Sequence, residues 1–122
     1  MQIKLGSTRK VFIFKNFVIK IPNIQEYRLF LHGILANLQE KTFSCMNRID
    51  LGKVKFCSHF GFILAMEKAN VLNYEDIDWN KFEDFLKLKY KDDEMKEFML
   101  SDLKPTNWGY INNQLVRIDY GN

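Results

Sequence analysis

Four polar side chains near the end of the chain have types and spacing that suit phosphate and metal chemistry: Asp102, Lys104, Asn107 and Asp119. Three of them share one short loop, SDLKPTN, which Pro105 stiffens. Asp119 follows a predicted hairpin, which returns the chain to the neighbourhood of Asn107. An amide oxygen beside a carboxylate suits Mg²⁺, which takes one or two carboxylates and leaves its other positions to water and phosphate. Lys104 can neutralise a phosphoryl group in transfer, and Asp102 remains as a base or an orienting group.

The same loop has a purely structural alternative. Asp, Asn and Pro also form turns, so DLKPTN could be an Asx-stabilised turn without chemistry. The elements around the loop therefore decide how much weight the four side chains carry.

Strands dominate the predicted elements of the first half. Residues 1–22 are rich in β-branched and aromatic residues and predict three strands, of which VFIF and FVIKI form a hairpin. The segment PNIQEYRLFLHGILANLQE predicts a helix with Asn23 as its N-cap and Glu26 completing a capping box. Gly33 lowers the stability of this helix and predicts a close contact. LGKVKFCS and FGFILAMEKA add two strands and complete an antiparallel sheet of about five.

The second half alternates between a helix and short strands. DIDWNKFEDFLKLKY predicts a helix capped by Asp76 or Asp78. EFML predicts a short strand, and GYI and LVRI predict a hairpin joined by NNQ. Strands, helix, strands, helix and small hairpins in this order predict an α+β fold.

Composition and charge narrow the classes of function. The 122 residues suit one domain, and 47% hydrophobic residues can form a core. No apolar run approaches about 18 residues, and the N-terminus lacks a signal-peptide core, so we expect a soluble cytoplasmic protein without membrane contact. A net charge of +3, spread along the chain, argues against nucleic acid as partner. Cys45 and Cys57, without histidines at ligand spacing, predict reduced thiols rather than zinc.

Five short segments together resemble the motifs of protein kinases. DLKPTN matches the catalytic loop D-L-K-P-x-N, and IDYG resembles the metal-binding D-F-G. FVIK resembles V-A-I-K, LGSTRKVF resembles a degraded glycine-rich loop, and LAMEKA resembles the hinge strand that meets the adenine edge. Their order is that of the family, although the resemblance covers only about the first half of a kinase fold. Short kinase-like proteins of this sort also occur in bacteriophages.

The resemblance implies roles for the matching residues. Lys20 would contact the α- and β-phosphates of ATP, and Lys104 would stabilise the γ-phosphoryl group. Asp102 would accept or orient the acceptor hydroxyl, whereas Asn107 and Asp119 would hold Mg²⁺. The residues expected around the nucleotide are Gly6, Ser7, Val11, Val18, Lys20, Glu40, Met66, Glu67 and Ala69. Backbone groups of residues 67–69 would meet the adenine, and the two valines would pack on its faces.

The glutamate partner of Lys20 and the residue at position 9 are the two uncertain points of this resemblance. The glutamate that pairs with Lys20 is either Glu26 or Glu40; the longer separation of Glu40 is closer to the family's and is favoured. Arg9 stands where a later glycine is expected, so polar side chains of this loop could donate to phosphates in place of backbone amides.

The resemblance divides one domain, 1–122, into an upper lobe with hinge at 1–69 and a reduced lower lobe at 70–122. We expect a single helix, at about residues 77–89, to support the lower lobe. No activation segment or A-P-E motif follows Gly121, so recognition of a protein substrate in the usual manner is not expected.

Two functions follow from this pattern. One is a minimal ATP- and Mg²⁺-dependent phosphotransferase. The other is a pseudokinase that binds a partner protein, for example a phage protein that inhibits a host enzyme or defence system in the host cytoplasm. An exposed apolar face, where lower-lobe helices would pack, could drive self-association or bind another protein. The sequence leaves open whether the chain is an enzyme.

Overall fold

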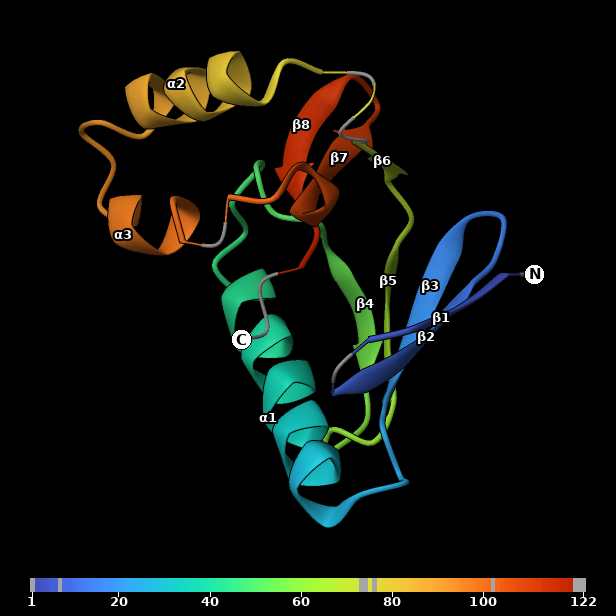
Figure 1. Ribbon diagram of the computed structural model, residues 1–122. Helices are drawn as coiled ribbons and strands as arrows, with labels where there is room; N and C mark the ends of the chain where they lie inside the picture. The colour runs from blue at the N-terminus through green and yellow to red at the C-terminus, as the bar shows by residue number, and fades with distance from the viewer. Residues whose placement is uncertain (1, 7, 73–74, 76, 102, 120–122) are drawn as a thin grey trace.

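The computed structural model describes residues 2–6, 8–72, 75, 77–101 and 103–119, and these form a mixed α+β fold (Figure 1). The larger sheet is antiparallel, with strands in the spatial order β1 (Gln2–Leu5), β2 (Arg9–Ile13), β3 (Phe17–Pro22), β5 (Leu64–Glu67) and β4 (Val54–Cys57). The smaller sheet consists of β6 (Asn70–Val71), β7 (Trp108–Ile111) and β8 (Gln114–Arg117). The predicted fold class and the five-stranded antiparallel sheet are therefore confirmed.

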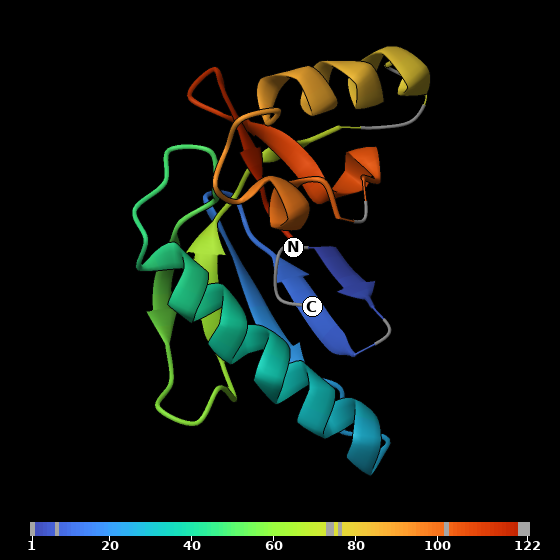
Figure 2. The ribbon, with the colours of Figure 1, turned by 90° about the vertical axis from the view of Figure 1, so that its left-hand side faces the viewer.

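The helices are arranged on one face and one end of the larger sheet. They are α1 (Tyr27–Ser44), α2 (Trp79–Lys89), α3 (Lys96–Met99) and the 3₁₀ turn η1 (Pro105–Asn107). Helix α1 crosses the face of the larger sheet, whereas α2, α3 and the smaller sheet gather at one end of it (Figures 1 and 2). No helix within the described ranges has the length and apolar character that a membrane span requires.

Helix α1 begins later than the capping pattern predicted. The N–H of Asn23 donates to Thr8 O at 2.9 Å, so this residue is held against the sheet, and the helix begins only at Tyr27. Its side chain instead accepts from the N–H of Gln25 at 2.9 Å, as in an Asx turn. Glu26 occupies the N-cap position with extended backbone and no side-chain cap bond. The predicted capping box is therefore wrong.

The face of α1 that packs on the sheet is made of small and polar residues. Gly33, Ala36, Asn37 and Glu40 are buried, and they follow one another at helical spacing. A methyl group at Gly33 would lie 2.5 Å from Thr8 O, which confirms the predicted close contact. The helix approaches the strands so closely that bulky apolar residues do not fit there. Several apolar residues of α1 are instead exposed: Tyr27, Leu31 and Leu35.

The second half differs from its predicted elements at two points. Asp78 caps α2 by accepting from the N–H groups of Asn80 and Lys81, whereas Asp76 lies outside the described residues. EFML, predicted as a strand, belongs instead to the short helix α3 and the residue after it. The β7–β8 hairpin turns on two residues with positive φ, Asn112 and Asn113, rather than on NNQ.

One cluster of buried side chains joins the two halves of the molecule. Its members are Leu51, Leu64, Met66, Leu86, Tyr90, Met99, Trp108 and Leu115, which come from the larger sheet, the smaller sheet and the helices beside it. The backbone continues this connection, because Arg117 pairs with Leu51 in a parallel bridge and exchanges hydrogen bonds with Asp50 and Gly52. The end of β8 is thus fixed against the loop that follows α1.

Candidate functional site

A cleft of about 390 Å³ opens between the larger sheet and the segments on either side of the β7–β8 hairpin. Its lining residues are Gln2, Lys4, Val11, Ile13, Val18, Lys20, residues 66–71, Thr106, Ile118 and Asp119. Three lysines and two carboxylates lie among them, so positive side chains outnumber negative ones by one. Pockets of this size with apolar walls and a few polar groups are typical small-molecule sites.

Lys20 connects this cleft to helix α1. The residue lies on β3, and its Nζ donates to Glu40 Oε1 at 2.7 Å and to Ile118 O at 3.2 Å. Glu40 has no exposed side-chain surface, and it reaches Lys20 because it lies on the buried face of α1. Of the two glutamates considered, Glu40 is therefore the one that pairs with Lys20. The ion pair joins sheet, helix and the segment after β8.

Arg9 adds a second cation to this group. Its Nη2 lies 2.6 Å from Glu40 Oε2 and 3.1 Å from Asp119 Oδ1, while its side chain is 7% exposed. The position on β2, opposite Pro22, places the guanidinium beside α1. We call Arg9, Lys20, Glu40 and Asp119 the cleft cluster. It contains two cations and two carboxylates and is electrically balanced.

Asn37 fixes the orientation of Arg9. Its Nδ2 donates to Lys20 O at 3.2 Å and to Gly61 O at 2.8 Å, so its Oδ1 faces the guanidinium and accepts from Arg9 Nη1 at 3.1 Å. The sequence reasoning missed both roles, because it considered Arg9 only as a phosphate donor. Asn37 and Glu40, three apart on one face of the predicted helix, could have indicated these partners. Polar groups on a buried face need hydrogen-bond or ionic partners.

The other predicted site residues fall into three groups. Val11, Val18, Met66, Glu67 and Ala69 line the cleft together with Lys20 and Asp119. Gly6, Lys104 and Asn107 are described but lie outside the cleft lining. Ser7 and Asp102 lie outside the described residues.

Two backbone N–H groups of the predicted hinge form hydrogen bonds within the protein. The N–H of Glu67 donates to Lys53 O at 3.0 Å, and that of Lys68 donates to Asn16 O at 3.4 Å. These two amides are engaged, so we expect a ligand at this segment to meet carbonyl oxygens or the N–H of Ala69. The contact between adenine and the backbone of residues 67–69 remains a prediction. Two of the three N–H groups of this segment are already bonded within the protein.

Arg117 supports the loop that precedes η1. Its Nη1 donates to the carbonyls of Phe98, Met99 and Ser101 at 3.0, 3.2 and 2.8 Å, at the end of α3. Its Nε donates to Asp119 O at 3.1 Å. One buried guanidinium therefore holds the backbone on both sides of the predicted catalytic loop, in addition to α2, which was expected to support this half alone.

A second ionic group, which we call the joint cluster, lies where the loop after α1 meets the turn after α2: Arg48, Asp50, Tyr90 and Asp93. Arg48 binds Asp50 at 2.9 and 2.8 Å and Asp93 at 3.0 and 2.8 Å, both in bidentate geometry. Tyr90 donates its hydroxyl to Asp50 Oδ2 at 2.8 Å. Burial opposes ionisation of Asp50, but these hydrogen bonds outweigh it and hold the pKa below the usual 3.8. Burial, followed by the bond to Asp50, raises the pKa of Tyr90.

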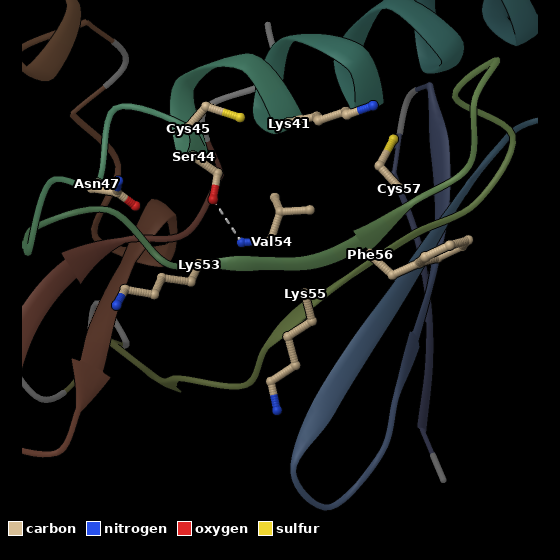
Figure 3. A pocket seen from close by; sticks show the side chains of 9 residues that line it. All are labelled: Lys41, Ser44, Cys45, Asn47, Lys53, Val54, Lys55, Phe56 and Cys57. Atoms are coloured by element: carbon tan, nitrogen blue, oxygen red, sulfur yellow. Dashed lines mark hydrogen bonds between the residues drawn. The ribbon is translucent and has the colours of Figure 1, made fainter.

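A separate hollow of about 330 Å³ lies between the end of α1 and the edge strand β4 (Figure 3). Lys41, Lys53 and Lys55 surround it, and Ser44 Oγ accepts from the N–H of Val54 at 2.9 Å. Both cysteines line it as free thiols, but Cys45 is exposed rather than packed. None of the predicted site residues belongs to this hollow, which makes its lysines useful controls for anion binding.

The described residues can be compared with what a nucleotide and a metal ion each require. The cleft offers apolar walls at Val11, Val18 and Met66 and a cation at Lys20. Asp119, which the resemblance assigns to Mg²⁺, already accepts from Arg9. Among the side chains that the structure describes, no group of three or more His, Cys, Asp and Glu is arranged to hold a metal ion.

Comparison with known proteins assigns no family to this chain. No family model matches it, and no curated protein is similar to it in sequence.

Proposed function

We propose that this chain is a kinase-like protein that binds ATP in the cleft between its larger sheet and the β7–β8 hairpin. The observation that carries the proposal is the ion pair between Lys20 on β3 and Glu40 on α1, at the edge of a cleft that Asp119 also lines. Protein kinases use a lysine on their third strand and a glutamate on the following helix in this way. The strand and helix order of the described residues supports the same interpretation.

Transfer of a phosphoryl group is the activity that the motifs add to this binding. Asp102 would take the proton of the acceptor hydroxyl while the γ-phosphoryl group moves to that oxygen and ADP leaves. Lys104 is exposed on the same loop and would stabilise the transferring group. Transfer would also need Asn107 and Asp119 to hold Mg²⁺, as the resemblance implies, and Arg9 competes for Asp119.

A thermal-shift titration with ATP tests the binding. ATP bound only by the folded protein raises the melting temperature in proportion to its concentration and affinity. We expect a rise for the wild type and a much smaller rise for Lys20→Met, each measured against the same variant without ATP. Lys53→Met, which removes a lysine of the separate hollow, is the matched control and should respond like the wild type. A rise lost in Lys53→Met and kept in Lys20→Met would place ATP elsewhere and reject this site.

Labelled ATP separates transfer from binding. We expect a phosphotransferase to release or transfer the γ-phosphate at a rate that falls at least about a hundredfold in Asp102→Ala. Asp119→Ala is measured in parallel, with excess Mg²⁺. Binding without any transfer in the wild type would reject the enzyme and retain the nucleotide-binding protein.

The second candidate is a pseudokinase that acts by binding a protein, and the apolar row on α1 favours it. Tyr27, Leu31 and Leu35 follow one another on the solvent side of this helix and are 76%, 41% and 56% exposed. Exposed apolar groups in a contiguous patch mark interaction surfaces. On α2, Phe85 and Leu88 are exposed as well, as expected for an apolar face in the lower half.

Sedimentation of the purified protein tests this candidate for self-association. We expect Leu31→Lys with Leu35→Lys to convert an oligomer into a monomer or to abolish binding of an identified partner. Leu88→Lys, on α2, is the control for a general change in surface charge. Loss of association in Leu88→Lys alone would move the interaction surface to α2.

A further inference from the structure

Arg9 stands where the kinase motifs have a glycine, so the resemblance predicts no cation at this position. A guanidinium with its side chain 7% exposed sits between Glu40 and Asp119, and Asn37 orients it through a third contact at 3.1 Å. Asp119 follows β8, whereas Asn37 and Glu40 lie three apart on α1, and Asn37 is itself held by two backbone carbonyls. The contact between Arg9 and Asp119 is therefore built into the fold rather than formed by an adjustable surface side chain.

The charge of this guanidinium bears directly on metal binding. Arg9 Nη2 lies 3.1 Å from Asp119 Oδ1, and Mg²⁺ binds carboxylate oxygens at about 2.1 Å. A divalent ion on either oxygen of Asp119 would lie close to the guanidinium, and the two positive charges would repel each other. Glu40 cannot relieve this repulsion, because its carboxylate already faces both Arg9 and Lys20.

The side chain of Asp119 is 42% exposed and lines the cleft, whereas Arg9 is 7% exposed and lies outside the cleft lining. The cleft lining holds Lys4, Lys20 and Lys68 as further positive groups for phosphates. Positive charge that a metal would bring to bound phosphates is thus present on the protein itself.

We propose that Arg9 takes the place of the divalent metal at Asp119, so that the cleft binds the phosphates of a nucleotide without a metal ion. The inference rests on the proposed nucleotide binding and states its cofactor requirement. It also makes a separate claim about metal alone: Arg9 excludes divalent ions from Asp119.

The first experiment compares ATP binding with and without metal. Thermal shifts of the wild type are measured with ATP in EDTA and with ATP in excess Mg²⁺. We expect apparent dissociation constants that agree within about threefold, a difference well under the tenfold that corresponds to 1.4 kcal/mol. A requirement for Mg²⁺ of about tenfold or more would overturn the inference while leaving nucleotide binding intact. Absence of any ATP shift in both buffers would reject the proposed function instead.

The second experiment needs no nucleotide and uses Mn²⁺ alone, followed by the electron paramagnetic resonance signal of the free ion. We expect no binding by the wild type, binding by Arg9→Met, and loss of that binding in Arg9→Met with Asp119→Asn. Arg9→Lys keeps the charge and should exclude Mn²⁺ like the wild type. Equal Mn²⁺ binding by wild type and Arg9→Met would overturn the inference.

If Arg9→Met does not fold, the wild type is compared with Asp119→Asn instead. Mn²⁺ binding by the wild type that Asp119→Asn abolishes would contradict the exclusion of metal from Asp119. Absence of Mn²⁺ binding from both proteins would support it.

Discussion

The cleft cluster and the joint cluster are built from the same groups and differ in what surrounds them. In the joint cluster, one arginine is held by two carboxylates, and a tyrosine hydroxyl completes the bonding of Asp50. In the cleft cluster, two cations share the buried carboxylate of Glu40, and the second carboxylate, Asp119, is partly exposed to a cavity. The joint cluster binds two structural elements to each other, whereas the cleft cluster has two of its charged groups, Lys20 and Asp119, on the lining of the cleft.

This difference separates a charge network that stabilises the fold from one that is suited to binding. Buried ion pairs gain little net stability over apolar packing, but removal of one partner is costly because it leaves an uncompensated charge. The joint cluster carries clear changes of pKa in Asp50, Tyr90 and Asp93 but lines no part of the cleft. Perturbed pKa values alone would therefore have pointed to the joint cluster rather than to the cleft.

Substitution of Glu40 should have the largest effect on stability. Glu40→Ala leaves Arg9 and Lys20 buried beside each other without their shared carboxylate, and we expect a loss of about 3–5 kcal/mol in the free energy of unfolding. Urea denaturation measures it, with the partly exposed Glu83→Ala as the control. A loss no larger than that of the control would show that the cleft cluster does not hold α1 on the sheet.

Substitution of Asp50 should cost less. Asp50→Ala removes the acceptor of Tyr90, but Arg48 keeps Asp93, so we expect a loss of about 2–3 kcal/mol. Combination with Tyr90→Phe in a double-mutant cycle should give a coupling of about 1 kcal/mol. Full additivity of the two losses would mean that the hydroxyl and the carboxylate act independently.

Acid should weaken the joint cluster in a defined direction. Hydrogen bonds to the charged forms hold the pKa values of Asp50 and Asp93 below their usual 3.8 in the folded protein. The unfolded chain then binds protons first, so this stability is present above about pH 4 and disappears as the pH falls through the lowered values. Urea denaturation of the wild type at pH 6 and pH 3, compared with Asp50→Asn, measures the effect. An equally steep decline in Asp50→Asn would assign the acid sensitivity to other carboxylates.

The exposed pair of Lys87 and Glu83 on α2 should have the smallest effect. These side chains meet at 3.0 Å at helical spacing, but solvent screens them. We expect Lys87→Ala to leave the melting temperature unchanged within the error of calorimetry. A clear decrease would show that this exposed ion pair contributes as much stability as the buried clusters do.

The parts of the fold that depend on local sequence were predicted well. The hairpin of β2 and β3 follows from alternating β-branched and aromatic residues, and the cap of α2 follows from Asp78. Glu40 was favoured over Glu26 because of its distance from Lys20 along the chain. The structure shows Glu40 on the buried face of α1, where it reaches Lys20.

The errors arose where distant residues decide the structure. EFML has the residues of a strand, yet Arg117 binds the last carbonyls of α3 from 16 to 19 positions away. On α1, Tyr27, Leu31 and Leu35 are exposed, because small and polar residues occupy the face that packs on the sheet at the close approach of Gly33. Arg9 was read as a loop residue since only the fold brings Asn37, Glu40 and Asp119 to it.

The contact at Gly33 also limits how α1 can move. A hydrogen atom is all that fits between this residue and the backbone of Thr8 and Pro22. Glu40 lies seven residues further along, about two helical turns from that pivot. We expect this contact to restrict any movement of α1 that would separate Glu40 from Lys20.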